Sequence, residues 1–227
     1  MMVNGARLVP DPSGALWWPG EKTLVVADLH FEKGSSFATR GRNFLPPYDT
    51  RATVEALARL VRHYTPKRLI ALGDSFHDDG AAGRLHIDDV ARLKRVAEQT
   101  ELVWIAGNHD PVPPDGLGGR VEEEVVIGPL RFRHIPEGRE AGEVAGHLHP
   151  KATVVVRGHG LTRRCFVTDG VKLVLPAFGA YAGGLDVRDP AFLPLFRRRF
   201  TAWMLGDARV FPVPAARLGA AESEATA

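Results

Sequence analysis

Three short runs of apolar, largely β-branched residues most constrain the fold of this 227-residue chain. They span residues 23–27, 68–72 and 102–106, and each is bounded by polar or glycine-containing turns. Runs of this kind are typical of strands that are buried on both faces of a sheet. Apolar stripes at helical spacing occupy residues 50–64 and 87–97, between successive runs. The alternation of strand and helix predicts a parallel sheet covered by helices.

The two predicted helices each present one apolar face. The first face contains Val54, Leu57, Leu60, Val61 and Tyr64, and the second contains Ile87, Val90, Leu93 and Ala97. Asp49, directly before the first helix, is the expected N-cap because a short carboxylate side chain can accept hydrogen bonds from the first turn.

After Gly107 the sequence contains short apolar runs with little helical spacing between them. Short strands with brief turns between them are predicted over residues 121–127, 130–134, 153–157, 164–168 and 171–175. They predict a second sheet that packs face to face with the first, with helices outside. We expect one domain over residues 1–214 and a flexible C-terminal tail over residues 215–227, which are low in bulky apolar residues.

Composition limits the setting in which this chain works. Hydrophobic residues make up 44% and charged residues 25%, the balance of a soluble globular protein. No apolar run approaches the roughly 20 residues that span a bilayer, and residues 1–10 lack the features of a secretory signal. The single cysteine, Cys165, excludes an intrachain disulfide and is expected to be a small strand residue. We therefore expect a cytoplasmic protein with no membrane partner.

Polar residues follow directly after each of the three buried strands. Asp28 and His30 follow the first, Asp74 follows the second, and Asn108 and His109 follow the third. Ligands of open α/β sheets gather outside the carboxyl ends of the strands, so we expect these side chains to share one rim.

Two later segments add histidines to this set. His134 lies at the end of a predicted strand, and His147 and His149 lie in a Gly-His-Leu-His-Pro segment. Carboxylate, amide and imidazole groups suit Mn²⁺, Fe or Zn²⁺, and the lack of paired cysteines disfavours a thiolate site. A central carboxylate such as Asp74 can bridge two ions about 3.5–4 Å apart. Each motif alone is also explained by ordinary turn chemistry, but the ordered set favours a two-metal site.

The motifs resemble the signature of the calcineurin-like metallophosphoesterase superfamily. In chain order they are Asp28-Leu29-His30, Gly73-Asp74, Gly107-Asn108-His109-Asp110, His134 and Gly146-His147-Leu148-His149. The resemblance implies an α/β fold, a four-layer α/β/β/α sandwich with two packed mixed sheets. It also implies a phosphoesterase that attacks phosphorus with a metal-activated water.

The resemblance also implies a role for each matching residue. Asp28, His30 and His149 would hold one metal ion, Asn108, His134 and His147 would hold the other, and Asp74 would bridge them. His109 would stabilise the transition state or protonate the leaving oxygen, with Asp110 orienting it. The family often has aspartate where this chain has His77, which leaves the roles of His77 and Asp78 open.

Further segments resemble the ligase-associated DNA damage response endonuclease subfamily (PdeM-type). They cover residues 28–34, 40–41, 45–50, 73–77 and 175–179, with the pair Gly183-Gly184 downstream. This resemblance implies a bacterial, cytoplasmic DNA repair endonuclease that uses two divalent ions, foremost Mn²⁺. Its partners would be DNA and other repair proteins such as a ligase or helicase. The oligomeric state stays open, with a dimer as one option.

The choice of substrate is open at the level of sequence. Arg40, Arg42 and Arg163 are the expected substrate-binding residues, although exposed arginines equally serve solubility and local ion pairs. A net charge of +2 permits a polyanion without requiring one. The alternatives are a small-molecule phosphoesterase acting on nucleotides, cyclic nucleotides or phosphomonoesters, and a metal-stabilised binding scaffold without catalysis.

Overall fold

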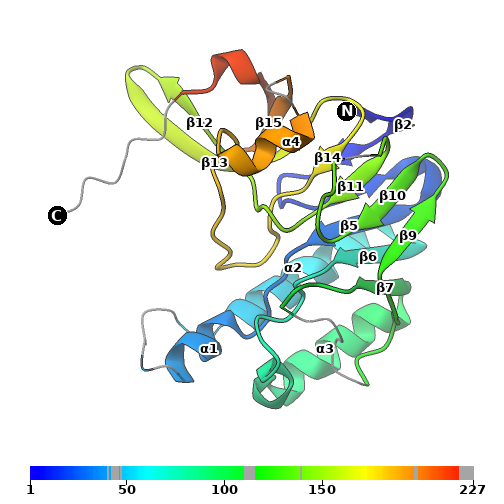
Figure 1. The fold of residues 1–227 in the computed structure, drawn as a ribbon. Coiled ribbons are helices and arrows are strands. Elements are labelled where there is room, and N and C mark those ends of the chain that lie inside the picture. Colours follow the sequence, from blue (N-terminus) through cyan, green and yellow to red (C-terminus); the bar gives the residue numbers. More distant parts are fainter. Residues whose placement is uncertain are drawn as a thin grey trace.

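Two β-sheets packed face to face form the centre of the molecule (Figure 1). The computed structural model describes residues 1–39, 41, 46, 48–109, 116–138, 140–196 and 199–219. Helices cover the outer face of each sheet, so the predicted four-layer α/β/β/α sandwich is confirmed.

The first sheet has the order β3-β4-β5-β6-β7-β8. Its strands are β3 (Val9–Pro10), β4 (Leu16–Trp18), β5 (Thr23–Ala27), β6 (Arg68–Leu72), β7 (Glu101–Ile105) and β8 (Arg120–Glu122). Strands β5 to β8 are parallel, and β3 and β4 add antiparallel partners at one edge. The three strands predicted from apolar runs are therefore confirmed.

The helices around this sheet are α1 (Lys33–Thr39), α2 (Asp49–Tyr64) and α3 (Ile87–Glu98). The short 3-10 segments are η1 (Pro19–Glu21), η2 (Ala81–Arg84), η3 (Pro190–Phe192) and η4 (Ala215–Arg217). The helix α4 (Leu193–Phe196) and η3 cover the second sheet. A separate hairpin, β1 (Met2–Val3) with β2 (Ala6–Arg7), closes one end of the sandwich.

The second sheet has the order β16-β15-β13-β14-β11-β10-β9, with β12 paired to β13. Its strands are β9 (Glu124–Ile127), β10 (Leu130–Arg133), β11 (Glu143–Ala145), β12 (Lys151–Val156), β13 (His159–Thr168), β14 (Leu173–Val174), β15 (Thr201–Leu205) and β16 (Val210–Pro214). The β12–β13 hairpin extends beyond the body of the sheet (Figure 1).

Side-chain alternation along β5 explains how one strand serves two cores. Leu24 and Val26 pack with α2 and α3, whereas Val25 and Ala27 pack against the second sheet. Successive side chains of a strand point to opposite faces, and both faces of β5 are covered, so all four residues are fully buried.

A further hydrophobic core lies between the second sheet and α4. Cys165 is buried in this core, as expected of a small strand residue. Burial raises the pKa of its thiol.

Three local predictions were wrong in detail. The predicted strand 121–127 is divided between the sheets, with β8 paired to β7 and β9 paired to β10. Asp49 is the first residue of α2 rather than its N-cap, and its carboxylate accepts a hydrogen bond from the Gly34 N–H at 3.0 Å instead. Ile87 is 78% exposed at the start of α3, and Val96 is buried on the apolar face instead.

Among the residues that the structure describes, no helix combines the length and hydrophobicity needed to cross a membrane. The structure describes five residues beyond the predicted boundary at residue 214. Residues 215–217 form η4, and the Gly219 N–H donates to the Thr153 carbonyl of β12 at 2.8 Å. The rest of the predicted tail, residues 220–227, lies outside the described part of the chain.

Candidate metal centre

Two groups of side chains that could hold a metal ion meet at the carboxyl edge of the first sheet. The first group, called cluster 1, contains Asp28, His30 and His149, and the second, cluster 2, contains Asp74, His134 and His147. Within each cluster, one ligand atom from every residue lies within 4.8 Å of the others. The structure therefore brings together residues that are up to about 120 positions apart in the sequence, as the strand-end pattern predicts.

The loops that carry these residues share an unusual backbone conformation. Asp28, His30, Asp74, His147 and His149 all have positive φ angles, of 53°, 45°, 45°, 69° and 46°. The left-handed region costs a non-glycine residue free energy, on the order of 1 kcal/mol or more, and such residues concentrate at functional sites. All five residues belong to the two groups of possible metal ligands.

The strand-end loops hold one another in place. The His30 N–H donates to the Asp74 carbonyl at 2.9 Å, and the His147 N–H donates to the Asp28 carboxylate at 3.1 Å. Each cluster is therefore fixed by backbone groups that belong to the loops of the other.

Cluster 1 is compact and largely buried. His149 Nε2 lies 3.1 Å from Asp28 Oδ1 and 3.3 Å from His30 Nε2. Burial, assisted by the nearby His149, lowers the pKa of His30 to about 3. The His30 ring is consequently neutral at pH 7 and has a lone pair to offer to a cation.

Cluster 2 converges on a single nitrogen atom. The Nδ1–H of His134 donates to the Leu72 carbonyl at 2.9 Å, which directs Nε2 toward the cluster. This Nε2 lies 2.9 Å from Asn108 Oδ1, 3.2 Å from His147 Nδ1 and 3.3 Å from Asp74 Oδ1. Electron-rich atoms at these distances favour a cation between them, so the donor set fits a divalent metal ion.

The ionisation of cluster 2 agrees with this chemistry. Burial alone would raise the pKa of Asp74. The hydrogen bond from His134, its charge and the hydrogen bond from the His109 N–H have a larger opposite effect, so they hold the pKa of Asp74 well below its usual range. Burial alone would lower the pKa of His134, but Asp74 and Asp28 outweigh it and raise that pKa. Burial and the nearby His134 lower the pKa of His147. Cluster 2 therefore contains the ionised carboxylate of Asp74. The acceptor groups of Asp74 and Asp28 favour a positive charge at His134 Nε2.

Two glycines let the backbone approach the centre closely. A Cβ atom on Gly73, whose φ is +67°, would lie 2.4 Å from Cγ of His134. A Cβ atom on Gly146 would lie 2.7 Å from Asp28 Oδ2. Both motifs therefore require glycine for a steric reason that the sequence alone does not reveal.

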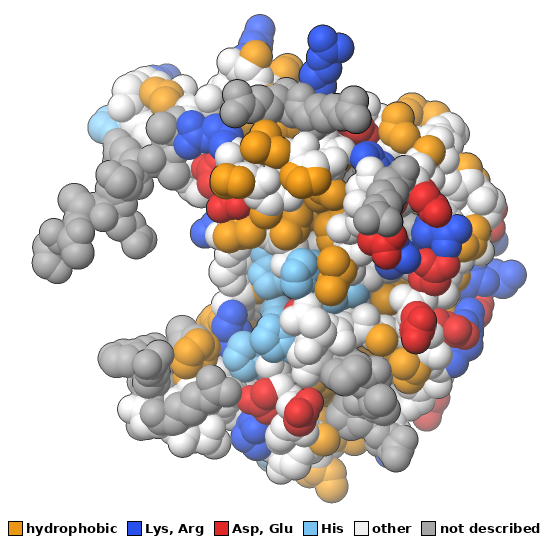
Figure 2. Space-filling model, viewed as in Figure 1, with side chains coloured by type: hydrophobic (Ala, Val, Ile, Leu, Met, Phe, Trp, Pro, Cys, Tyr) orange, Lys and Arg blue, Asp and Glu red, His pale blue; other side chains and the backbone are white. Residues whose placement is uncertain are grey.

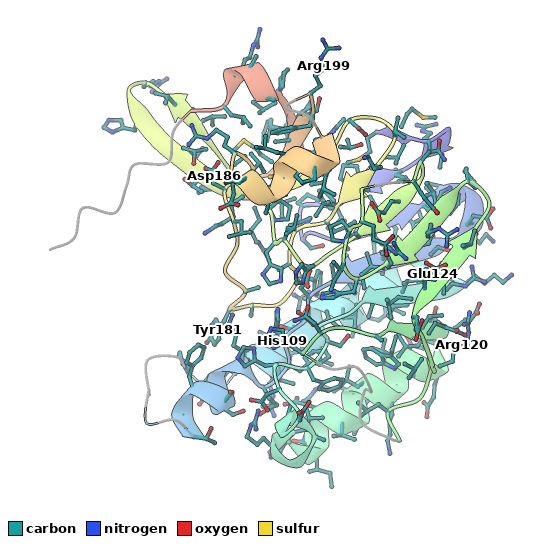
Figure 3. The ribbon with its side chains drawn as sticks, viewed as in Figure 1. His109, Arg120, Glu124, Tyr181, Asp186 and Arg199 are labelled. Atoms are coloured by element: carbon teal, nitrogen blue, oxygen red, sulfur yellow. The ribbon has the colours of Figure 1, made fainter. Side chains whose placement is uncertain are left out.

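His109 lies beside the donor clusters without belonging to either of them. Its N–H donates to Asp74 Oδ1 at 2.9 Å, and its Nε2 lies 3.9 Å from Asp74 Oδ2. Its side chain is 47% exposed, and Figure 3 shows it on the same side of the molecule as Tyr181. The ring of His77 stacks on it, with centroids 5.8 Å apart and planes 12° apart. Asp110, expected to orient His109, lies outside the described residues.

Asp78 has a different setting from its neighbour His77. Its Oδ1 accepts hydrogen bonds from Arg84 Nη2 at 2.7 Å and from the Gly80 N–H at 3.0 Å. These contacts hold η2 against the loop that follows Asp74. Asp78 therefore stabilises local structure.

The centre lies on the floor of an open hollow. Figure 2 shows histidine side chains gathered where the molecule is indented between its two halves. A pocket of about 240 Å³ opens beside Asn108 and His134 and is bordered by Arg133. The centre is therefore accessible to a substrate from solvent.

The predicted substrate-binding arginines are only partly described. Arg40 and Arg42 lie outside the described residues. Arg163 is exposed on β13, and among the described residues it makes no ion pair or hydrogen bond with either cluster. Arg164 is half-buried, and its guanidinium donates to the Ala177 carbonyl at 2.7 Å, which is a structural contact.

Three comparisons relate this chain to known proteins. Residues 21–136, a little over half of the chain, match the sequence profile of the family described as calcineurin-like phosphoesterase. The crystal structure of the Pseudomonas putida nuclease MPE is similar over 94% of this chain and 98% of that chain, with a TM-score of 0.71 and 29% identity. Yfce, a phosphoesterase from E. coli, has 16% identity over 84% of this chain and 97% of that chain, with a TM-score of 0.41. No curated protein sequence matches the chain.

The match covers four of the five sequence blocks, from Asp28-Leu29-His30 to His134. It agrees with the sandwich of two mixed sheets and with the two donor clusters at the strand ends. The chain belongs to the calcineurin-like phosphoesterase family, and it is a metal-dependent phosphoesterase.

Proposed function

We propose that this protein is a nuclease that hydrolyses phosphodiester bonds of DNA with the help of two divalent cations. The observation that carries the proposal is the convergence of two donor clusters beside His109. Asp74 belongs to cluster 2 and also contacts the backbone of His109, so it links the metal centre to the exposed imidazole. The likeness to the Pseudomonas putida nuclease over 94% of the chain supports a polynucleotide substrate.

Asp28, His30 and His149 would hold one cation, Asn108, His134 and His147 the other, and Asp74 would bridge them. When bound, the two ions would lower the pKa of a water and offset the negative charge of the phosphoryl oxygens. The buried position of the ligands keeps their geometry fixed, because Asp28 is fully buried and Asp74 is 2% exposed.

His109 would act on the substrate from the open side of the centre. Its imidazole can donate a hydrogen bond to a phosphoryl oxygen, or a proton to the oxygen that leaves when the P–O bond breaks. The His109 N–H bond to Asp74 anchors the base of this side chain, and stacking on His77 limits its rotation.

The shape of the site suits a polymer. The hollow that holds the histidines is open on one side of the molecule (Figure 2). A chain of nucleotides can therefore continue past the reacting phosphate in both directions, which an enclosed pocket would prevent.

The wider role that we propose is bacterial DNA repair in the cytoplasm, with Mn²⁺ as the metal and a ligase or helicase as a partner. This part of the proposal is supported by the resemblance of residues 28–34, 45–50 and 73–77 to PdeM-type endonucleases.

The test is a Mn²⁺-supplemented assay on single-stranded circular DNA, a chromogenic phosphodiester and the matching monoester. The wild type is expected to cleave the DNA and the diester, and the His109→Ala and Asp74→Asn variants to lose most of both activities. His159→Ala is the matched control, because this histidine is exposed near the turn of the β12–β13 hairpin. Equal DNA cleavage by all four proteins would contradict the proposal, and hydrolysis of the monoester alone would favour a small-molecule phosphoesterase.

A further inference from the structure

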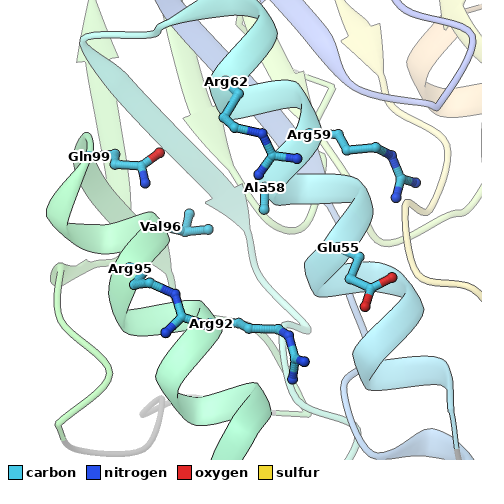
Figure 4. A pocket seen from close by; sticks show the side chains of 8 residues that line it. All are labelled: Glu55, Ala58, Arg59, Arg62, Arg92, Arg95, Val96 and Gln99. Carbon is cyan, nitrogen blue, oxygen red and sulfur yellow. The ribbon is translucent and has the colours of Figure 1, made fainter.

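An arginine-lined groove lies between α2 and α3, on the outer face of the first sheet. It has a volume of about 440 Å³, and Figure 4 shows its lining from both helices. The lining residues are Glu55, Ala58, Arg59 and Arg62 from α2, with Arg92, Arg95, Val96 and the adjoining Gln99 from α3. Four arginines and one glutamate therefore line this groove.

Three of these arginines have no acidic partner in the described part of the chain. Arg92 pairs with Asp89 at 2.9 Å, whereas Arg59, Arg62 and Arg95 are exposed and make no ion pair with any residue that the structure describes. By contrast, Arg131 and Arg133 on the second sheet each pair with two or more glutamates. The groove thus holds an excess of positive charge that the protein itself does not neutralise.

The spacing of the arginines adds to this excess. Arg59 and Arg62 are one turn apart on α2, and Arg92 and Arg95 are one turn apart on α3. Like charges at this spacing destabilise a helix, and rows of like charge on two neighbouring helices repel further. The arrangement therefore does not serve stability, and a bound anion would offset the repulsion.

We propose that this groove binds phosphate groups of the DNA backbone outside the catalytic cleft, an inference that rests on the proposed nuclease function. Guanidinium groups bind phosphate through paired N–H donors, with better geometry than lysine offers. The lining contains no aromatic side chain on which a base could stack. The groove would consequently bind DNA of any sequence through its backbone charge.

The course of the helices connects the groove to the metal centre. Strands β5 and β6 end at the centre, and α2 and α3 run back from that rim toward the start of the next strand. The Asp49 carboxylate at the start of α2 contacts the Gly34 N–H, four residues after His30. From Asp49, Arg62 lies about 20 Å along the helix. A strand of several nucleotides that leaves the cleft can therefore reach the groove.

The surface between the carboxyl edge of the sheet and the groove carries paired charges. Nε of Arg51 on α2 lies 3.4 Å from Oδ1 of Asp89, and its Nη2 lies 3.9 Å from Oδ2 of Asp88; both aspartates are on α3. These ion pairs neutralise the acidic start of α3, so they reduce repulsion of a passing polyanion.

The test compares two triple variants of the full chain that remove the same charge. One is Arg59→Gln/Arg62→Gln/Arg95→Gln, and the matched control is Arg7→Gln/Arg209→Gln/Arg217→Gln, whose arginines are exposed elsewhere. Binding of a fluorescein-labelled oligothymidylate is measured by anisotropy in EDTA across a salt series, so that metal ions in the cleft do not contribute. Thermal unfolding checks that both variants fold, and hydrolysis of a small chromogenic diester with Mn²⁺ checks the catalytic centre.

The groove variant is expected to bind the oligonucleotide on the order of tenfold more weakly. The slope of log affinity against log salt should become shallower by about 2, since each lost contact with a single strand contributes about 0.7. Small-diester hydrolysis should match the wild type. Equal affinity and slope in the wild type and both variants would overturn the inference while leaving the nuclease function intact.

Two further outcomes would also count against it. If the wild type hydrolyses the small diester but neither binds nor cleaves DNA, the nuclease function fails and the inference fails with it. If the groove variant binds DNA normally but loses binding to a polyglutamate peptide that the control retains, the groove is a docking site for an acidic protein.

Discussion

The Nδ1–H of His134 donates to the Leu72 carbonyl at 2.9 Å, and this one bond determines which ring nitrogen faces cluster 2. Leu72 is the last residue of β6, and Asp74 follows two positions later. The strand that supplies the carboxylate therefore also orients the histidine that lies against it.

Replacing His134 with alanine should remove one ligand of cluster 2. Because loss of a residue that merely supports a metal ligand typically costs 10–100-fold, we expect kcat/KM for a small diester to fall by at least about 100-fold. Metal analysis should show fewer ions bound per chain than in the wild type. His159→Ala serves as the control, and unchanged activity and metal content in His134→Ala would exclude this histidine as a ligand.

Divalent cations should stabilise the fold. A ligand at about a hundredfold above its Kd contributes about 2.7 kcal/mol to the free energy of unfolding. For a chain of this size that corresponds to a rise in Tm of roughly 5–10 °C. Scanning calorimetry in EDTA and in Mn²⁺ measures the shift, which should shrink in Asp74→Asn. Equal Tm values in the two conditions would argue against metal binding at these clusters.

Gly73→Ala should disturb the centre through sterics alone. The new Cβ would lie 2.4 Å from His134 Cγ, and the +67° φ angle of this position is unfavourable for alanine. We expect a loss of about 1–3 kcal/mol in the free energy of unfolding, together with reduced activity. Gly83→Ala is the control, because nothing lies within 4 Å of its Cβ position. Both are measured by urea unfolding, and equal stabilities would show that the loop adapts without strain.

Tyr64→Phe tests a contact far from the centre. The Tyr64 hydroxyl donates to Asp11 Oδ2 at 2.6 Å, and its ring stacks on Trp17. A hydrogen bond to a charged acceptor stabilises by about 1.5–3 kcal/mol when buried, so we expect about 1 kcal/mol at this half-exposed site. Activity should not change. A loss of stability that is indistinguishable from zero would mean that the bond contributes nothing.

The same tyrosine predicts a pH dependence. Burial and the hydrogen bond to Asp11 raise the pKa of Tyr64 above its usual value of about 10. A raised pKa in the folded state stabilises the protein fully below the unfolded-state pKa, and this stability is lost as pH rises above it. The stability difference between wild type and Tyr64→Phe should therefore shrink as pH rises above about 10. Urea unfolding at several alkaline pH values checks this, and a constant difference would contradict it.

Much of the fold could be predicted because its signals are local. The runs that became β5, β6 and β7 and the stripes of α2 and α3 are encoded within windows of 5 to 16 residues. Strand β11 was not predicted, since three residues carry too little periodicity. The division of residues 121–127 between two sheets was also missed, because hydrophobicity does not reveal which neighbour a strand pairs with.

The sequence by itself determined which chemical groups are available for the metal centre. Each of them follows an apolar run or lies in a compact motif, and this made them identifiable: Asp28, His30, Asp74, Asn108, His147 and His149. Only the tertiary structure decided how they meet. The orientation of His134 depends on the carbonyl of Leu72, 62 positions earlier in the chain, and on the missing side chain of Gly73. The groove likewise forms only when the helix that carries Arg59 and Arg62 packs beside the helix that carries Arg92 and Arg95. Local periodicity is encoded by neighbouring residues, whereas convergence of distant side chains depends on sheet register and helix packing, which no short segment contains.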